Sequence, residues 1–341
     1  MIYDAVVIGA GPAGCTAAKI LADKGARVVL AERHKLPRYK SCSGMLIRKT
    51  LELTEKYFGE QVPASVCCTP TENKGMIFTD DSGKEYRFEQ EGLNVWRSSF
   101  DGWLAEKAAE SGARLLDGCG VANIEDDGDQ VCAALKNGDT LKASYAIICE
   151  GAAGQLKKTV TGKSTKYVTT FQTFNKGSIE LDPHYFYAYL QPKLSEYDAW
   201  FNVKDGLLVL GVSVLNNEKI GFYYREFISH MEKRHKLKIS EKVKEEKWIM
   251  PLITPDTKPE RGIGRILFCG ESAGFLNPMG EGISSAIECG YAAAVSIQEN
   301  YGDPLTVLKQ YSRLTEETES YMKRQWKFVG RLSKKFEEKN G

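Results

Sequence analysis

The stretch Asp4-Ala-Val-Val-Ile-Gly-Ala-Gly-Pro-Ala-Gly14 predicts a buried strand that runs into a tight glycine turn and then into a helix. The apolar run Val6 to Ile8 is typical of a parallel strand covered on both faces. Gly9, Gly11 and Gly14 have Gly-x-Gly-x-x-Gly spacing. The first glycine permits the turn, the second admits a pyrophosphate close to the backbone, and the third lets the helix pack on the strand. The positive helix N-terminus then favours a phosphate.

The residues after this turn complete a strand-helix-strand unit. Apolar residues recur at helical spacing over 13–21, Gly25 is placed to end the helix, and 27–31 form a second apolar strand. Glu32 follows that strand, where an acidic side chain accepts hydrogen bonds from an adenosine ribose. These features predict a dinucleotide-binding unit. The alternative is a structural glycine turn beside a surface glutamate.

Length and charge limit the classes of protein to consider. The 341 residues are enough for one large domain or two interleaved domains. The net charge is +1 with both signs mixed along the chain, so we expect no nucleic acid as a partner. No apolar run approaches the roughly 18 residues of a membrane-spanning helix, and no charged-then-apolar leader precedes the first strand. We therefore expect a cytoplasmic protein.

The cysteines predict reduced thiols. The chain has nine, an odd number, scattered through mostly apolar or glycine-rich surroundings. They show no paired Cys-x-x-Cys spacing, so we predict no metal site. Cys42 differs because it lies in a polar loop, 33–44, where Arg38 and Lys40 would favour a thiolate. The alternative for Cys42 is a small residue packed beside a ligand.

The middle of the chain predicts further strands. Lys74 to Phe88 predicts a hairpin that interrupts the nucleotide unit and begins a second sheet. Tyr145-Ala-Ile-Ile-Cys-Glu-Gly151 repeats an apolar strand that ends in an acidic residue and glycine, which places Gly151 for a second nucleotide contact. Residues 165–255 are rich in aromatic side chains. They suit either a sheet that roofs a pocket or an ordinary packed sheet.

Two segments near the C-terminus complete the pattern. Arg265 to Ala286 predicts a strand, a glycine-rich loop and a helix that starts near Gly282, whose N–H groups face a ligand. A purely structural loop is the alternative. Residues 304–339 predict a helical region that becomes basic, and it either packs on the body of the protein or contacts a membrane surface. Its apolar residues near helical spacing are Trp326, Val329, Leu332 and Phe336.

Three separated segments resemble the FAD-binding motifs of flavoproteins with the para-hydroxybenzoate hydroxylase fold. They are Gly9-x-Gly-x-x-Gly14 with Glu32, Cys149-Glu-Gly-Ala-Ala153, and Gly270-Glu-Ser-Ala-Gly-Phe-Leu-Asn-Pro-Met-Gly-Glu-Gly-Ile283. Arg97 with Phe100-Asp101-x-x-Leu104 is similar to a helix start whose arginine contacts the cofactor in that family. The resemblance implies FAD as the cofactor.

Within that superfamily the chain most resembles the geranylgeranyl reductase group. Lys40-Ser-Cys-Ser-Gly44 is similar to the group's cysteine-containing loop. Tyr197-Asp-Ala-Trp-Phe-Asn-Val203 partly matches its aromatic motif, which lines a lipid tunnel. The resemblance implies Cys42 at the active face of the flavin and Tyr197 and Trp200 at the substrate wall, and these three residues are the catalytic candidates.

The implied fold is an α/β protein in which a Rossmann-like FAD-binding domain is interleaved with a mixed β-sheet substrate domain and followed by a C-terminal helical segment. The expected ranges are 1–73, 96–160 and 260–300 for the FAD-binding domain, 74–95 and 161–259 for the substrate domain, and 301–341 for the helical segment. The residues expected to contact FAD are Gly9, Gly11, Pro12, Ala13, Gly14, Glu32, Arg33, Ser43, Gly44, Arg97, Gly151, Gly270, Glu271, Gly280, Gly282 and Ile283.

The leading hypothesis is a FAD-dependent oxidoreductase that reduces carbon–carbon double bonds of a hydrophobic, isoprenoid-like substrate by hydride transfer from reduced flavin. A flavin-dependent monooxygenase or halogenase is an alternative because these enzymes share the fold, although the halogenase motif Trp-x-Trp-x-Ile-Pro is absent from the sequence. A non-catalytic flavin-binding sensor is a second alternative.

The electron donor and the location follow from the same reasoning. The sequence has no second dinucleotide fingerprint, so we expect either NAD(P)H that binds transiently or a ferredoxin-like protein as the electron donor. The expected partner is a hydrophobic or lipid substrate. Peripheral contact with the inner membrane surface through the basic C-terminal helix is the alternative to a purely cytoplasmic location.

Overall fold

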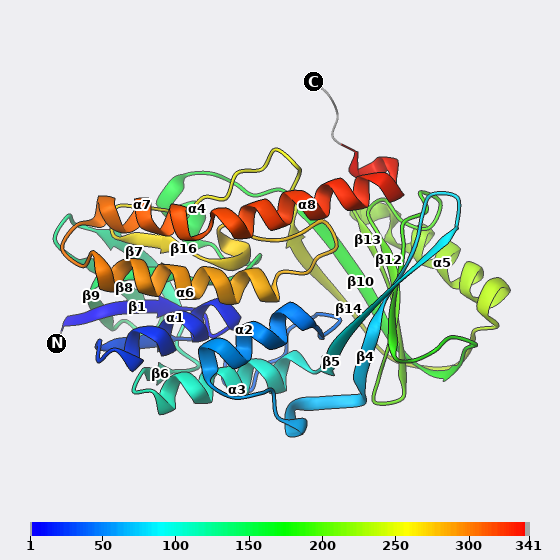
Figure 1. Ribbon diagram of the computed structural model, residues 1–341, viewed down its shortest axis with the longest axis horizontal. Coiled ribbons are helices and arrows are strands. Elements are labelled where there is room, and N and C mark those ends of the chain that lie inside the picture. The colour runs from blue at the N-terminus through cyan, green and yellow to red at the C-terminus, as the bar shows by residue number, and fades with distance from the viewer. Residues whose placement is uncertain (1, 338–341) are drawn as a thin grey trace.

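A computed structural model describes residues 2–337 and contains two eight-stranded sheets (Figure 1). The first sheet has the order β15-β16-β9-β1-β2-β6, with β8 paired to β9 and β7 paired to β8. Its strands are β1 (Ile2–Ile8), β2 (Val28–Ala31), β6 (Arg114–Leu116), β7 (Val121–Asp126), β8 (Val131–Leu135), β9 (Thr140–Ile148), β15 (Gly262–Ile263) and β16 (Ile266–Phe268).

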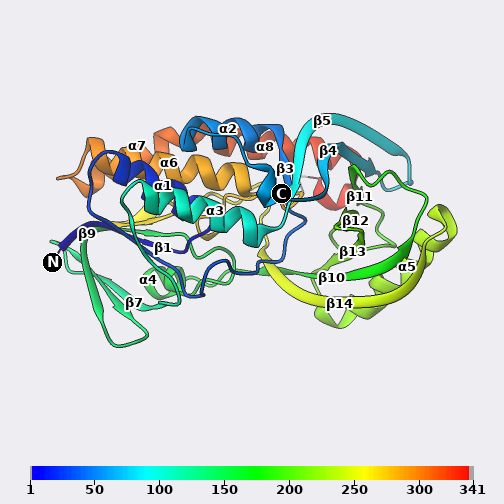
Figure 2. The same ribbon diagram turned by 90° about the horizontal axis from the view of Figure 1, so that it is seen from below.

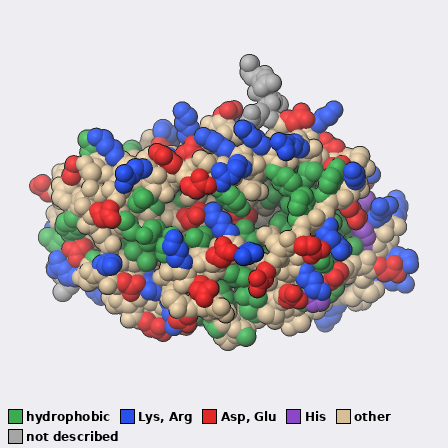
Figure 3. Space-filling view, viewed as in Figure 1, with side chains coloured by type: hydrophobic (Ala, Val, Ile, Leu, Met, Phe, Trp, Pro, Cys, Tyr) green, Lys and Arg blue, Asp and Glu red, His purple; other side chains and the backbone are tan. Residues whose placement is uncertain are grey.

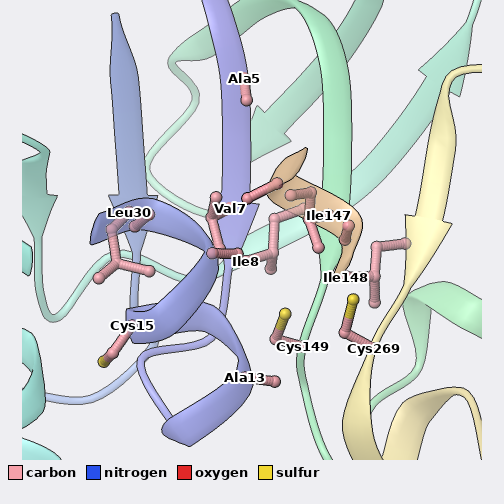
Figure 4. Packing of buried hydrophobic residues seen from close by; sticks show 14 of the residues in the cluster. Ala5, Val7, Ile8, Ala13, Cys15, Leu30, Ile147, Ile148, Cys149 and Cys269 are labelled. Carbon is pink, nitrogen blue, oxygen red and sulfur yellow. The ribbon is translucent and has the colours of Figure 1, made fainter. Parts of the chain in front are cut away.

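The apolar run of β1 lies at the centre of this sheet. β1 pairs in parallel with β2 and β9, so Val7 lies between Leu30 and Ile147. All three side chains are fully buried, and Figure 4 shows them on adjacent strands beside the first turns of α1. Burial on both faces explains why these strands are continuous apolar runs rather than alternating patterns.

Eight α-helices and four short 3-10 helices occur within residues 2–337. The α-helices are α1 (Pro12–Asp23), α2 (Arg48–Phe58), α3 (Arg97–Glu110), α4 (Leu156–Thr161), α5 (Ile220–His235), α6 (Ile283–Glu299), α7 (Pro304–Leu314) and α8 (Glu316–Leu332). The 3-10 helices are η1 (Ala64–Val66), η2 (Asn217–Lys219), η3 (Gly270–Ser272) and η4 (Lys334–Phe336). In Figure 2, α6, α7 and α8 lie on one side of the central strands of the first sheet, and α4 and the β7 end of the same sheet lie on the other.

The second sheet has the order β14-β10-β13-β12-β11-β4-β5-β3. Its strands are β3 (Met45–Ile47), β4 (Cys67–Thr79), β5 (Glu85–Val95), β10 (Tyr167–Ser178), β11 (Tyr185–Tyr189), β12 (Ala199–Lys204), β13 (Leu207–Val214) and β14 (Lys238–Pro251). One face is covered by α5, where Phe227 and Met231 are fully buried with Phe201 and Leu210 of the sheet. The opposite face packs in part against α8, and the rest of it lines the site.

The expected fold class is confirmed: the chain is α/β, with a nucleotide-type sheet, a mixed second sheet and C-terminal helices. The predicted hairpin is present, but its first strand begins at Cys67 because β4 continues past a β-bulge. The strand predicted from Tyr145 begins earlier, because β9 runs without a break from Thr140 to Ile148. β7 was not predicted, because Val121–Asp126 is short and half of its residues are polar.

The C-terminal helices pack on the body of the protein. Trp326, Val329, Leu332 and Phe336 are all buried in one apolar cluster with residues of the second sheet. This arrangement favours the packed helix among the two interpretations, because the apolar side chains proposed for membrane contact already face protein. Figure 3 shows Lys and Arg side chains over α8, with both signs of charge interspersed elsewhere on that face. Within residues 2–337, no helix is both long and apolar enough to cross a membrane.

Candidate functional site

The carboxyl ends of the parallel strands bring the predicted motifs together at one edge of the first sheet. Gly9 follows β1, Glu32 follows β2, Glu150 lies just beyond β9, and Gly270 lies just beyond β16. In sheets of this kind ligands bind at this edge, where the strand order reverses. Side chains and backbone at this edge line a cavity of about 510 Å³.

The glycine turn has the geometry that its sequence predicts. Gly9 has φ +106°, and a Cβ there would overlap the carbonyl oxygen of Cys149. A Cβ at Gly14 would overlap the carbonyl oxygen of Gly9, so the absence of a side chain lets α1 approach β1. Gly11 caps α1 with no side-chain hydrogen bond to the first turn. The N–H groups of that turn are therefore available to a phosphate.

A buried cluster of four charges lies beneath the turn. Glu32 Oε2 accepts a hydrogen bond from Ala10 N at 3.0 Å and lies 3.2 Å from Arg38 Nε. Arg38 Nη1 donates to Asp101 Oδ2 at 2.9 Å, and Arg97 donates to both oxygens of Asp101. Burial alone raises the pKa of Asp101, but the guanidinium groups of Arg97 and Arg38 lower it below its ordinary value. The two acids and two bases therefore neutralise each other.

Cys42 lies in the cavity wall, but its basic neighbour differs from the one expected. Arg38 faces Asp101 and Glu32, and Lys40 Nζ lies 3.3 Å from Glu271 Oε1. Arg97 is the arginine beside the thiol. Burial alone would lower the pKa of Arg97, but Asp101 and Cys42 raise it above its ordinary value. The backbone N–H of Gly44 also points to Cys42 Sγ, at 3.4 Å.

The second and third motifs meet across the cavity. Glu271 Oε2 accepts a hydrogen bond from Ala152 N at 3.1 Å, which joins the loop after β9 to the loop after β16. Burial raises the pKa of Glu271, but Lys40 and Arg97 lower it below its ordinary value. Glu150 instead accepts from Leu156 N, and burial raises its pKa. The two glutamates thus have different surroundings despite their similar sequence context.

Two neighbouring rows of the second sheet form the opposite wall of the cavity. The strand register places Trp248, Thr170 and Ser213 side by side, and Asp198 O accepts a hydrogen bond from Ser213 N. The next row consists of Glu246, Gln172, Gly211 and Trp200. A Cβ at Gly211 would overlap the Trp200 indole, so the ring lies against this strand. Among these eight residues only Glu246 and Gly211 do not line the cavity.

Most of the predicted site residues are gathered in this cavity, and three are not. The predicted residues that line it are Gly9, Gly11, Pro12, Ala13, Glu32, Arg33, Cys42, Ser43, Arg97, Gly151, Trp200, Gly270, Glu271, Gly280, Gly282 and Ile283. Gly14 packs against Gly9 behind the turn. Gly44 has φ +68° and packs against Val95 O, and Tyr197 packs on Phe336 with ring centroids 4.9 Å apart. These three contacts are internal packing, which motif position does not reveal.

Sequence reasoning missed four residues that line or shape the site. Gln172 and Trp248 reach it through strand register, Asp198 lies just before β12, and Asp101 reaches the charge cluster from α3. Asp101 was part of the motif quoted with Arg97, and its spacing four residues after Arg97 on a helix indicates that the two side chains can pair. Residues 2–337 contain no group of three or more His, Cys, Asp or Glu side chains arranged to hold a metal.

Residues at this edge fit FAD. The uncapped first turn of α1 fits a pyrophosphate, and Glu32, which is 4% exposed, lines the cavity at the ribose position after β2. A second helix, α6, starts at the cavity with Gly282 as its cap and Ile283 in its first turn. The second sheet faces this edge from across the cavity. The fold and the cavity therefore define a dinucleotide-binding flavoprotein.

Comparison with known proteins supports this class. A profile of the FAD binding domain family matches residues 3–249, and the chain belongs to that family. It is therefore a member of a FAD-dependent oxidoreductase family. The chain is 28% identical over 327 residues to the protein FixC of Escherichia coli O157:H7, which covers 87% of this chain and 76% of FixC. It is 34% identical to FixC of Salmonella typhi over 157 residues, 44% of this chain and 37% of that protein.

Solved structures share the fold. A geranylgeranyl bacteriochlorophyll reductase-like protein from Thermoplasma acidophilum superposes with a TM-score of 0.82 and 21% identity, covering 97% of this chain and 87% of the other. The flavin-dependent halogenase CmlS superposes with a TM-score of 0.76 and 18% identity, covering 97% of this chain and 64% of CmlS. The fold expected from the resemblance is thus confirmed, while these identities carry no information on the reaction.

Proposed function

We propose that this chain uses bound FAD to reduce a carbon–carbon double bond of a hydrophobic, isoprenoid-like substrate. The observation that carries the proposal is that one cavity has two unlike walls. One wall has the glycine turn, Glu32 and the basic side chains that suit a dinucleotide, and the other has Phe186, Trp200 and Trp248. A ligand held between these walls would have its apolar part against aromatic rings and the flavin on its other side.

Bound FAD in its reduced form supplies the hydride, and the neighbouring carbon takes a proton from a protein group or from water. The residues of this chain position the reactants and exclude water. The ion pair of Lys40 with Glu271 ties the loop that carries Cys42 to the loop after β16. We propose that Cys42 faces the reacting side of the flavin, because it lies in the cavity wall next to Arg97.

The proposed electron donor is either NAD(P)H, which would bind transiently, or a ferredoxin-like protein. The support for this proposal is the sequence, which contains one dinucleotide fingerprint, at Gly9 to Gly14. FAD occupies that fingerprint in the proposed complex. The reductant therefore needs no permanent site of its own.

A flavin-dependent monooxygenase or halogenase is the second candidate. It is supported by the fold that the chain shares with CmlS over 97% of its length. Both chemistries start from reduced flavin, and they differ in whether the flavin reacts with substrate or with oxygen. The reaction of the reduced flavin therefore separates the two candidates.

The test is an anaerobic mixing experiment. FAD-loaded protein is reduced chemically and mixed with a geranylgeranyl lipid, and flavin absorbance is followed before oxygen is admitted. We expect reoxidation that depends on the lipid, and a loss of at least tenfold in its rate for Cys42→Ser. Cys132→Ser, at a partly exposed position on β8, is the matched control. A flavin that stays reduced until oxygen enters would reject the reductase and support the second candidate.

A further inference from the structure

The sheet wall of the cavity carries polar groups but no cation. All the lysines and arginines that line the cavity belong to the nucleotide-binding part of the chain: Arg33, Arg38, Lys40, Arg97 and Lys136. The cavity-lining residues of the two sheet rows are neutral apart from Asp198, and burial raises the pKa of that carboxyl above its ordinary value. A phosphorylated group at this wall would therefore be buried without a counter-charge.

Gln172 has a fixed orientation in this wall. Its Nε2 donates to Glu246 Oε1 at 2.5 Å and to Ser41 Oγ at 3.3 Å. Burial alone raises the pKa of Glu246, but hydrogen bonds from Tyr39, Gln172 and Lys244 lower it. An ionised carboxylate only accepts hydrogen bonds, so the amide nitrogen must face Glu246. The amide oxygen, Gln172 Oε1, then faces away from Glu246, and it receives no hydrogen bond from the described residues.

Trp200 supplies a donor two strands away in the same row. Its Nε1 is buried without an acceptor among residues 2–337. The indole lies over Gly211, which is the register partner of both Gln172 and Trp200. The Trp200 atoms that would overlap a Cβ at Gly211 include Cε2, which is bonded to Nε1. The unpartnered N–H is thus next to the strand that separates it from Gln172, and a buried donor without a partner destabilises the protein unless a ligand accepts from it.

We propose that this wall selects an uncharged, hydroxyl-bearing substrate, whose hydroxyl donates to Gln172 Oε1 and accepts from Trp200 Nε1. A hydroxyl is both donor and acceptor, so one group satisfies both residues. Glu246 is the positioning residue, because it holds the Gln172 amide in the orientation that presents its oxygen. The inference rests on the proposed function only for the isoprenoid chain attached to the hydroxyl, and it excludes a diphosphate at this wall.

Calorimetric titration of oxidised, FAD-loaded protein tests the inference without turnover. The three probes are farnesol, farnesyl methyl ether and farnesyl diphosphate. We expect farnesol to bind about 3–10-fold more tightly than the ether, which cannot donate, and the diphosphate to bind most weakly. Equal binding of alcohol and ether, or preference for the diphosphate, would overturn the proposal.

Variants assign the selectivity to named groups. Gln172→Leu removes the acceptor, Trp200→Phe removes the donor, and Glu246→Gln frees the amide to turn. In Gln172→Leu, the preference for farnesol over the ether should fall to less than about twofold. In Trp200→Phe and Glu246→Gln, the preference should fall by a smaller amount. Glu241→Gln is the matched control, because Glu241 lies on the same strand and is exposed, and it should keep the full preference. Unchanged preference in Gln172→Leu would overturn the assignment.

A second pair of probes separates this inference from the proposed function. Cinnamyl alcohol and its methyl ether have the same difference at the hydroxyl but no isoprenoid chain. Preference for the alcohol in this pair, with no binding of the farnesyl compounds, would reject the isoprenoid substrate and retain hydroxyl selection. Equal binding within both pairs, or no binding of any of the four neutral compounds, would overturn hydroxyl selection itself.

Discussion

At the scale of single residues, Asp101 is the buried charge on which the nucleotide end depends most. It is 0% exposed and takes hydrogen bonds from both Arg97 and Arg38. Arg38 also contacts Glu32 and donates to Ala10 O, so Asp101 supports the turn through one intermediate side chain. Removing one member of such a set leaves the others buried without full compensation.

Asp101→Asn should therefore lower the free energy of unfolding by about 3–5 kcal/mol. The side-chain volume is kept, so the loss reports on charge and hydrogen bonding rather than on a cavity. Denaturant unfolding monitored by circular dichroism measures it. The control is Glu52→Gln, which breaks an exposed i,i+4 pair with Arg48 and should change stability by less than about 0.5 kcal/mol. A loss below about 1 kcal/mol for Asp101→Asn would contradict this view.

The same residue predicts a pH dependence with a definite sign. The pKa of Asp101 is lowered in the folded protein from the ordinary value of 3.8. Its contribution is therefore complete above the unfolded pKa and is lost as the pH falls below 3.8 through the folded pKa. The difference in unfolding free energy between wild type and Asp101→Asn should shrink between pH 5 and pH 2. A constant difference across that range would show that the carboxylate charge is not responsible.

At the scale of elements, the contact between α1 and β1 depends on a missing side chain. A Cβ at Gly14 would overlap the carbonyl oxygen of Gly9, and a Cβ at Gly290 of α6 would overlap the carbonyl oxygen of Ala13. These two glycines let α1 fit between the first sheet and α6. The position of the α1 N-terminus, and hence of its free N–H groups, follows from this packing.

Gly14→Ala should weaken FAD binding at least tenfold and destabilise the fold, because α1 must move away from Gly9. Overpacking of a core contact typically costs about 1–3 kcal/mol. FAD titration and denaturant unfolding give the two values. Gly221→Ala is the control. Gly221 is also a helical glycine, but the nearest atom to a Cβ built there is Arg225 Nη1, at 3.4 Å, at the end of a side chain that can move. Gly221→Ala should be neutral or slightly stabilising, and a neutral Gly14→Ala would disprove the close-approach argument.

The C-terminal segment is anchored by a partly buried lysine. Lys335 Nζ donates to Tyr197 O at 2.7 Å and Ser195 O at 3.2 Å, next to the ring contact of Phe336 with Tyr197. Burial lowers the pKa of Lys335 to about 8, from an ordinary value of 10.5. Between these two values the unfolded chain binds more protons than the folded protein, so this group makes stability rise with pH.

Lys335→Met should remove this rise. Relative to the variant, wild type should gain stability between pH 7.5 and pH 10, as the buried amine loses its proton in the folded state. Thermal unfolding of both proteins at the two pH values measures the change. Lys334→Met, at the adjacent exposed position, provides the control and should follow wild type. Parallel curves for wild type and Lys335→Met would contradict the buried position.

At the scale of the whole molecule, the two sheets are joined through the cavity and through the loop 33–44. Tyr39 of this loop donates to Glu246 of β14 at 2.6 Å, and Lys40 pairs with Glu271 beyond β16. The loop therefore contacts both walls. A ligand that touches both walls should stabilise the folded protein as a unit, because it binds the native state and not the unfolded chain.

FAD at about 100 times its Kd should raise the free energy of unfolding of the apoprotein by about 2.7 kcal/mol. Riboflavin is the matched ligand, since it keeps the flavin ring but lacks the pyrophosphate and the adenosine. It should stabilise much less at the same concentration, because the glycine turn and Glu32 have nothing to bind. Equal stabilisation by both ligands would show that the nucleotide end of the cavity does not contribute.

The sequence by itself determined the nucleotide end of this protein. Gly9, Gly11 and Glu32 act through backbone geometry and strand ends, which are local properties, and parallel strands bring their carboxyl ends to one edge wherever the apolar runs pair. The same reasoning located Gly151, Gly270 and Gly282 at that edge. Apolar runs and turn residues predicted the strand-helix-strand unit and the start of a second sheet, and the family resemblance implied the complete α/β fold.

Only the tertiary structure decided the opposite wall and the partners of each charge. Gln172, Gly211, Trp200 and Glu246 form one row because four strands pair in a particular register, and a shift of one residue would turn each side chain to the other face. Tyr197 packs on Phe336 rather than in the cavity for the same reason of long-range packing. Local pattern specifies the backbone at a strand end, whereas the neighbours of a side chain depend on residues far away in the chain.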